Sequence, residues 1–340
     1  MGGWRNWSLS NYETADRAPI RVYLDQKDFS RIGKGLAGNP TCLEDVEIYN
    51  WLLPLVEAGR IRVYFSWCHA VETLRYDDSK VDVLEPYCRA IDNLTQGHCI
   101  RWPIAILQEE IPACLAQLSG FGGQVVADYP YGRTVDAFPP IPYHAFGPME
   151  EAVKKELEND LSIGPLVNLS LQAPQFKKLG TFFDSLAGSI VASLQAEQQK
   201  YGEDGMEPKV VERTLVDLFL KHIDARLEEF CAEHGIDRDV IREKLRKSKL
   251  AGIPALNVVV TFAVEYYKRH RGELGRSRKP KQSDFLDLHH IRNLPYVDVF
   301  GCDAFFAEVA KNTAKHFGAQ VAPKLTDVQR ILEKDYSLRS

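Results

Sequence analysis

The sequence lacks any pair of cysteines spaced as Cys-x-x-Cys, although it contains seven cysteines in 340 residues. An odd and scattered set of cysteines supports neither a disulfide framework nor a thiolate zinc site. A long apolar run is also missing, because Asn257, Thr261 and Glu265 interrupt the most apolar segment, residues 251–267. We expect this segment to be a buried helix and expect no association with a membrane, since a membrane span needs about 20 predominantly apolar residues.

The first ten residues lack the apolar core of a signal peptide, and Asn6 stands where a myristoylation motif has Ser or Thr. The chain also has no internal repeat and no low-complexity tract. With 45% hydrophobic and 26% charged residues, its composition is that of a soluble protein with one elaborate domain or two. Together with the cysteine pattern, these features predict a cytoplasmic protein.

Positive charge is concentrated in one part of the chain. The net charge is −5, but residues 242–281 hold twelve Lys or Arg and three Glu, so this stretch carries +9 and the rest carries −14. For residues 242–249 two interpretations stay open, a solvated helix face or a surface for a polyanion. Residues 268–281 contain two glycines and a proline and are expected to form a loop directly before Asp284. The candidate nucleic-acid-binding residues of this loop are Lys268, Arg269, Arg271, Arg276, Arg278, Lys279 and Lys281.

Strand and helix patterns alternate at both ends of the chain, which predicts an α/β fold with a parallel sheet. Apolar runs predict strands at residues 20–25, 61–66, 98–102, 296–301 and 319–323. Helical periodicity dominates between them, and only residues 128–149 are too irregular to assign. The simplest assembly is a discontinuous α/β domain, residues 18–103 and 268–340, split by a large all-α insertion at residues 104–267.

Acidic residues gather around the ends of the predicted strands. The segment SDFLDLHHIRNLPYVDVFGCDAFF, residues 283–306, carries four aspartates among apolar residues, and Asp25 follows the first strand. Residues just beyond the carboxyl ends of parallel strands line the crevice where ligands bind. Two carboxylates about 4 Å apart repel by roughly 4 kcal/mol at an effective dielectric constant of about 20, so such a group needs a cation, and Mg²⁺ or Mn²⁺ is the natural choice. The candidate metal ligands are Asp25, Glu72, Asp284, Asp287, Asp298 and Asp303.

Most of these acids also have a structural interpretation. Asp303 could cap the helix that follows it, and Asp284 could cap another. Asp298 lies within an apolar strand and could pair with a nearby histidine or arginine. Helix capping is not expected to explain Asp25 or Glu72, and this argues for a site.

Two other motifs point to different chemistry. GKGLAG, residues 33–38, fits the pattern GxGxxG of dinucleotide sites, but Pro40 comes where the phosphate-binding helix should continue. Cys68 and His69 are adjacent on a predicted helix and therefore point apart, so they cannot form a nucleophile and base pair by themselves. We expect a buried thiol and a hydrogen-bonded imidazole at these two positions.

Three segments of the chain resemble the acidic blocks of PIN-like domains, metal-dependent nucleases of the FEN-like superfold, and in particular their larger bacterial branch. The segments are VYLDQKDFSRI, HAVETL and DFLDLHHIRNLPYVDVFGCD. The resemblance implies a three-layer α/β/α domain that binds Mg²⁺ or Mn²⁺ and hydrolyses phosphodiester bonds, with single-stranded RNA the first expected substrate. The catalytic residues that it implies are Asp25, Glu72, Asp287 and Asp303.

The sequence departs from the family pattern at two places. Lys27 stands where these domains usually have Asn, and Gly301 with Cys302 replaces a usual Thr or Ser. One alternative is therefore a catalytically weak PIN-like module that binds nucleic acid, or that uses the helical insertion to bind a protein partner or itself. A second is a Mg²⁺-dependent phosphatase with Asp25 as nucleophile, but such enzymes usually carry a second Asp at the position of Lys27.

Overall fold

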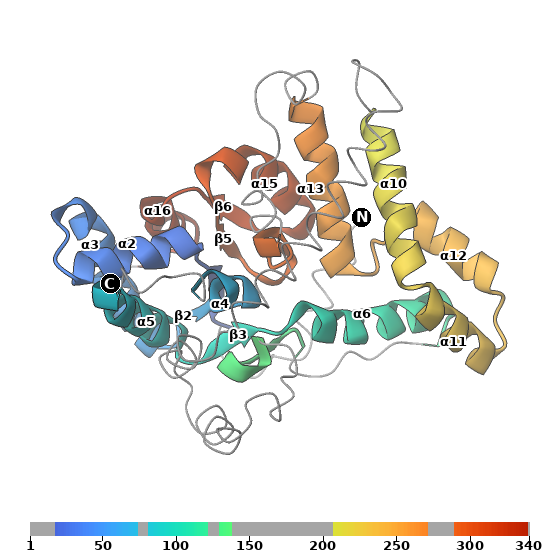
Figure 1. Ribbon diagram of the computed structural model, residues 1–340, viewed down its shortest axis with the longest axis horizontal. Coiled ribbons are helices and arrows are strands. Elements are labelled where there is room, and N and C mark those ends of the chain that lie inside the picture. Colours follow the sequence, from blue (N-terminus) through green and yellow to red (C-terminus); the bar gives the residue numbers. More distant parts are fainter. Residues whose placement is uncertain (1–17, 74–80, 122–128, 138–206, 271–288, 339–340) are drawn as a thin grey trace. The chain divides into compact units, whose positions relative to one another are not determined.

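The structure is a computed structural model that describes residues 18–73, 81–121, 129–137, 207–270 and 289–338 (Figure 1). The chain divides into two compact units. The first comprises Met1–Trp102, Pro130–Phe183 and Tyr296–Ser340, and the second comprises Pro103–Tyr129 and Asp184–Pro295.

A four-stranded parallel sheet forms the centre of the first unit. Its strands are β1 (Ile20–Tyr23), β2 (Ile61–Tyr64), β5 (Val299–Gly301) and β6 (Gln320–Ala322), in the order β2-β1-β5-β6. Val22, Val63 and Phe300 are fully buried, as is typical of parallel strands that helices cover on both faces. The prediction that the two ends of the chain share one parallel sheet is confirmed.

Helices connect these strands and pack on the sheet. The helices of the first unit are α2 (Gln26–Leu36), α3 (Leu43–Glu57), α4 (Trp67–Thr73), α5 (Val81–Thr95), α15 (Ala304–Phe317) and α16 (Leu325–Asp335), with short 3₁₀ helices η1 (Pro40–Cys42) and η3 (Thr134–Ala137). The helix α2 packs on α3 and α5, while α16 packs on α3 and on the strands β5 and β6. The chain leaves β1 toward β2 through α2 and α3, and it leaves β5 toward β6 through α15.

A small antiparallel sheet adjoins the end of β2. It pairs β3 (His98–Ile100) with β4 (Tyr131–Arg133), and Phe65 bridges to β3, since its backbone N donates to the carbonyl of His98 at 3.0 Å. The strand predicted near residues 98–102 is present as β3. It was expected in the main parallel sheet, but it pairs with β4 and, within the described residues, is linked to the end of β2 only by the bridge from Phe65. The strand β4 lies in the segment that could not be assigned, because three residues with no buried side chain give no alternating pattern.

The glycines of GKGLAG lie within and just after α2, and close packing explains two of them. A Cβ atom on Gly33 would lie 2.8 Å from the Cα of Tyr87 in α5, and one on Gly35 would lie 2.6 Å from the carbonyl oxygen of Cys42. Only a residue without a side chain lets these backbones approach so closely.

All regular elements described in the second unit are helical. They are α6 (Pro103–Leu118), α10 (Pro208–His222), α11 (Asp224–His234), α12 (Arg238–Lys247) and α13 (Pro254–His270), followed by the 3₁₀ helix η5 (Leu294–Tyr296) at the boundary of the units. The buried Glu110 of α6 accepts hydrogen bonds from the backbone N of Ala255 at 3.0 Å and from the hydroxyl of Tyr129, so it caps the amino end of α13. Among the described helices, none is both long and apolar enough to span a membrane.

Candidate active site at the carboxyl ends of β1 and β5

Two of the predicted acids follow neighbouring strands of the main sheet, at the same edge. The connection from β1 leads to β2 on one side, and the connection from β5 leads to β6 on the other, so the chain changes direction between the neighbouring strands β1 and β5. Asp25 lies two residues after β1, and Asp303 lies two residues after β5. Such a switch point is where open α/β sheets bind their ligands, outside the carboxyl ends of the strands.

Asp25 is the N-cap of α2. Its Oδ1 accepts a hydrogen bond from the backbone N of Gln26 at 2.8 Å, and its own backbone N donates to Oδ2 of Asp28 at 3.2 Å. The second contact forms a capping box together with a reciprocal bond from the backbone N of Asp28 to the Asp25 side chain. The expectation that capping would not explain Asp25 was therefore wrong. The local signal for this capping box is Asp28, an acid three residues after Asp25.

Asp303 is the N-cap of α15, as one of its two interpretations predicted. Its Oδ1 accepts from the backbone N of Phe305 at 2.7 Å, and the residue is exposed. Within the described residues its Oδ2 makes no hydrogen bond or ion pair, so the cap uses only one of the two carboxylate oxygens. Each aspartate thus uses its Oδ1 for the cap, while the Oδ2 of Asp25 contacts Lys27.

The ammonium group of Lys27 lies between the two strand ends. Its Nζ is 3.3 Å from Oδ2 of Asp25 and donates a hydrogen bond to the backbone carbonyl of Cys302. Oxygen atoms from both strand ends therefore already converge on a positive charge, and oxygen donors of this kind fit a hard cation such as Mg²⁺ or Mn²⁺. Within the described part of the chain, however, no three side chains of His, Cys, Asp or Glu come together closely enough to hold an ion.

Asp28 is a buried carboxyl group that was not among the site residues predicted from the sequence. It is 2% exposed, and burial together with the charge of Asp25 raises its pKa to about 7, although Lys27 acts in the opposite direction. Gly301 faces it: a Cβ atom at position 301 would lie 3.2 Å from Oδ2 of Asp28 and 3.0 Å from the carbonyl oxygen of Tyr23. The glycine at position 301 therefore leaves room for this buried acid.

Glu72 lies in α4, the helix that follows β2. Its charge and that of Asp25 both affect the pKa of the buried Tyr23. Burial raises the pKa of Tyr23, and the charges of Asp25 and Glu72 raise it further. Both carboxylates therefore lie within electrostatic range of Tyr23, whose hydroxyl bonds to that of Ser66 at 2.7 Å.

His69 connects α4 to the end of β1. Its Nε2 donates to the carbonyl of Leu24 at 2.8 Å, and its Nδ1 accepts from the backbone N of Ser66 at 3.0 Å. His69 and Cys68 are both buried, so the predictions of a hydrogen-bonded imidazole and a buried thiol are confirmed. The imidazole holds the residue before Asp25 against the helix that carries Glu72.

Asp298 does not join this group. It precedes β5 and forms a bidentate ion pair with Arg21, with 2.7 Å from Nη2 to Oδ1 and 3.0 Å from Nε to Oδ2. Arg21 lies four residues before Asp25, so Asp298 lies about 13 Å farther back along the strands, at roughly 3.3 Å per residue. The ion pair with Arg21 is the structural interpretation that the sequence left open beside a metal-ligand role for Asp298.

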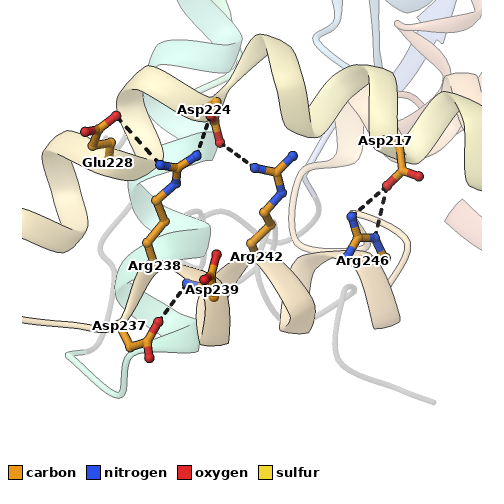
Figure 2. A network of polar contacts seen from close by, with 8 residues as sticks. All are labelled: Asp217, Asp224, Glu228, Asp237, Arg238, Asp239, Arg242 and Arg246. Atoms are coloured by element: carbon orange, nitrogen blue, oxygen red, sulfur yellow. Dashed lines mark hydrogen bonds and ion pairs between the residues drawn. The ribbon is translucent and has the colours of Figure 1, made fainter.

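The basic helix α12 of the second unit uses its arginines within the protein (Figure 2). Arg238 and Arg242 both pair with Asp224 of α11, at 2.6 Å and 3.0 Å, while Arg246 pairs with Asp217 of α10 at 2.9 Å. These contacts join three helices, and they favour the structural interpretation of the charged run over a polyanion surface.

The structure describes the first residues of the predicted basic loop, up to His270. Lys268 and Arg269 belong to α13, which extends to His270, so the loop begins later than predicted. Lys268 also pairs with Glu265 at 2.6 Å. The remaining basic residues of the loop and two of the predicted acids lie outside the described residues: Arg271, Arg276, Arg278, Lys279, Lys281, Asp284 and Asp287.

Comparisons of the chain with protein-family models, curated proteins and solved structures found no match.

Proposed function

We propose that the protein is a metal-dependent nuclease, an endoribonuclease in the first instance, built on a three-layer PIN-like α/β/α domain. One observation carries the proposal: Asp25 and Asp303 follow adjacent parallel strands at the switch point of the sheet, where oxygen atoms of Asp25 and Cys302 contact the ammonium group of Lys27. The resemblance of the acidic segments to PIN-like nucleases, which includes the same two aspartates, also supports it.

In this proposal Mg²⁺ or Mn²⁺ would bind to Asp25 and Asp303, and Glu72 and Asp287 would complete the ligand set. The described residues do not by themselves bring three of these acids together. When bound, such an ion lowers the pKa of a water molecule and offsets the negative charge that develops during phosphodiester hydrolysis. The helix-capping bonds of Asp25 and Asp303 fix the orientation of their carboxylates. The amino ends of α2 and α15 lie at the same edge, where their backbone dipoles favour a phosphate anion.

A nucleic-acid-binding module without hydrolysis is the second candidate, and Lys27 is the observation that favours it. The ammonium group already offsets the charge of Asp25, so these oxygens have a cation without any metal. The phosphatase is disfavoured, because Lys27 stands where the second catalytic carboxylate is needed.

The test uses one purified protein and two substrates. Single-stranded RNA and DNA of the same sequence are incubated with Mn²⁺, with Mg²⁺ or with EDTA, and products are separated on denaturing gels. We expect cleavage of RNA with either ion and none with EDTA. Binding of RNA without cleavage under any condition would reject the nuclease in favour of the binding module.

The basic loop is expected to set the salt dependence of substrate binding. Replacing Arg276, Arg278 and Lys279 with Ala should weaken binding to single strands of any sequence and reduce the slope of log affinity against log salt by about 2, since each lost contact with single-stranded nucleic acid contributes roughly 0.7. The matched control removes three positive charges from exposed positions of the first unit: Lys34, Lys311 and Lys334. An equal change of slope in both triple variants would mean that net charge, and not the loop, determines binding.

A further inference from the structure

We propose that one face of the strands β1 to β4 is a separate contact surface for a single-stranded nucleic acid, whose backbone phosphates bind to Arg62 and Arg133. We call it the arginine–tyrosine face, and all of its residues belong to the first unit: Arg21, Arg62, Tyr64, His98, Tyr131 and Arg133. The inference rests on the proposed function for its choice of ligand, but it requires neither a metal ion nor the acids at the strand ends.

The register of the strands places these side chains next to one another. In the main sheet Arg21 of β1 is paired with Arg62 of β2, and in the small sheet His98 of β3 is paired with Arg133 of β4. Side chains of directly paired residues lie on the same face of a sheet. Tyr64 connects the two pairs, because it lies two residues after Arg62 and its ring centroid is 6.3 Å from that of His98. Both pairs therefore belong to one continuous face.

Tyr131 completes this face from β4. Its ring stacks on that of Tyr64 with 4.7 Å between the centroids, and its hydroxyl accepts a hydrogen bond from Nη1 of Arg21 at 2.8 Å. Tyr64 is buried, whereas Tyr131 and His98 are half-buried and Arg133 is exposed. Accessible aromatic rings beside positive charges are the combination with which proteins bind single-stranded nucleic acids.

The arginines of this face outnumber its acids. Like charges on directly paired residues destabilise a sheet, and Asp298 offsets only Arg21, through the bidentate ion pair described above. Among the residues that the structure describes, no carboxylate forms an ion pair with Arg62 or Arg133. The side chain of Arg62 instead forms a hydrogen bond with that of Tyr64. Two guanidinium groups are therefore left with positive charge for an external anion.

His98 experiences this excess of positive charge. Its pKa is lowered to about 4 by burial and by the charges of Arg62 and Arg133. Asp136 does not offset them, although it accepts a hydrogen bond from the backbone N of Arg133. A Cβ atom on Gly132 would lie 2.5 Å from Oδ2 of Asp136, so this acid lies on the opposite face of β4. A phosphate group fits the two arginines, because a guanidinium can donate two parallel hydrogen bonds to its oxygens.

The experiment measures binding of a fluorescent single-stranded RNA to the full chain by anisotropy, in EDTA and over a range of salt concentrations. The variant Arg62→Gln with Arg133→Gln removes two charges from the face, and Arg62→Lys with Arg133→Lys keeps them. The matched control, Lys34→Gln with Lys334→Gln, removes two charges from exposed positions of α2 and α16. We expect the Gln pair to bind about tenfold more weakly at low salt, with a slope of log affinity against log salt shallower by about 1.4, since each lost contact contributes roughly 0.7. The control should stay within about twofold of wild type, and the Lys pair should fall between them.

The melting temperature without nucleic acid tests whether the two arginines serve the fold instead. The Gln pair should melt no lower than wild type, because it removes the repulsion between Arg62 and Arg21. A clearly lower melting temperature would assign the arginines a structural role and overturn the inference.

Other results would also overturn the inference, and they differ in what they say about the proposed function. RNA binding with the same affinity and salt slope in wild type and the Gln pair would reject the arginine–tyrosine face but leave the proposed function intact. An equal loss in the control would mean that net charge alone determines binding. Binding of inorganic phosphate, measured by calorimetry, without any binding of RNA would replace the nucleic acid with a small anion. Absence of both would reject the face together with the proposed function.

Discussion

Asparagine in place of Asp25 or Asp303 is expected to reduce RNA cleavage at least about 100-fold while leaving the fold intact. Asn caps helices about as well as Asp, so the amide oxygen can still accept from the backbone N of Gln26 or Phe305. What the substitution removes is the negative charge that a metal ion needs. The measurement is the initial rate of cleavage at saturating Mn²⁺, together with the melting temperature in EDTA.

The matched control is Asp237→Asn, the same substitution at another N-cap. Asp237 caps α12, where its Oδ1 accepts from the backbone N of Asp239 at 2.8 Å, and it belongs to no proposed site. This variant should cleave RNA at the wild-type rate. If Asp25→Asn and Asp303→Asn also cleaved at that rate, the two aspartates would be caps and nothing more.

Metal-dependent melting separates the two roles of Asp303 further. In EDTA, Asp303→Asn should melt no lower than wild type, because the cap is kept and repulsion among the acids is reduced. With Mn²⁺ it should lose most of the rise in melting temperature that metal binding gives to wild type. A variant that responds fully to Mn²⁺ would show that Asp303 is not a ligand.

The positions of Asp25 and Asp303 could be predicted because they depend on a rule with a simple local signal. Each follows an apolar run of strand-forming residues, and parallel strands place their carboxyl ends at one edge. The pairing of the two strands links residues far apart, such as Tyr23 with Phe300, yet it followed from the return of the α/β pattern after the helical segment. Only its order within the sheet needed the structure.

The contact of Lys27 with Cys302 and the burial of Asp28 beside Gly301 could not be predicted, since both depend on residues far away in the sequence. Lys27 reaches the carbonyl of Cys302, and Asp28 is buried where Gly301 leaves space. The α12 helix shows the same limit, because its basic pattern alone did not reveal that Arg242 pairs with Asp224 of another helix. Local patterns indicate where charge lies along the chain, but tertiary contacts decide whether that charge faces a partner or the solvent.

Replacing Asp28 with Asn is expected to stabilise the metal-free protein at pH 8, by up to about 4 kcal/mol. The pKa of this carboxyl group is raised from 3.8 to about 7 in the folded protein, chiefly by burial. Between about pH 4 and pH 7 the folded state therefore binds more protons than the unfolded state, so its stability falls as the pH rises through this window. The three-unit shift corresponds to roughly 1.4 kcal/mol per unit, and asparagine removes the charge responsible for it.

The side-chain amide oxygen in Asp28→Asn could still accept from the backbone N of Asp25, so the capping box would be kept. Urea unfolding in EDTA at pH 5, 6, 7 and 8 should show a gain for Asp28→Asn that grows with pH and is smallest at pH 5. Asp45→Asn is the contrasting control, because this buried acid pairs with Arg31 at 2.8 Å and its loss should destabilise the protein. The same gain at every pH would show that Asp28 does not titrate in this window. With saturating Mn²⁺ the gain at pH 8 should shrink, because a divalent ion on Asp25 would offset the charge of Asp28 as well.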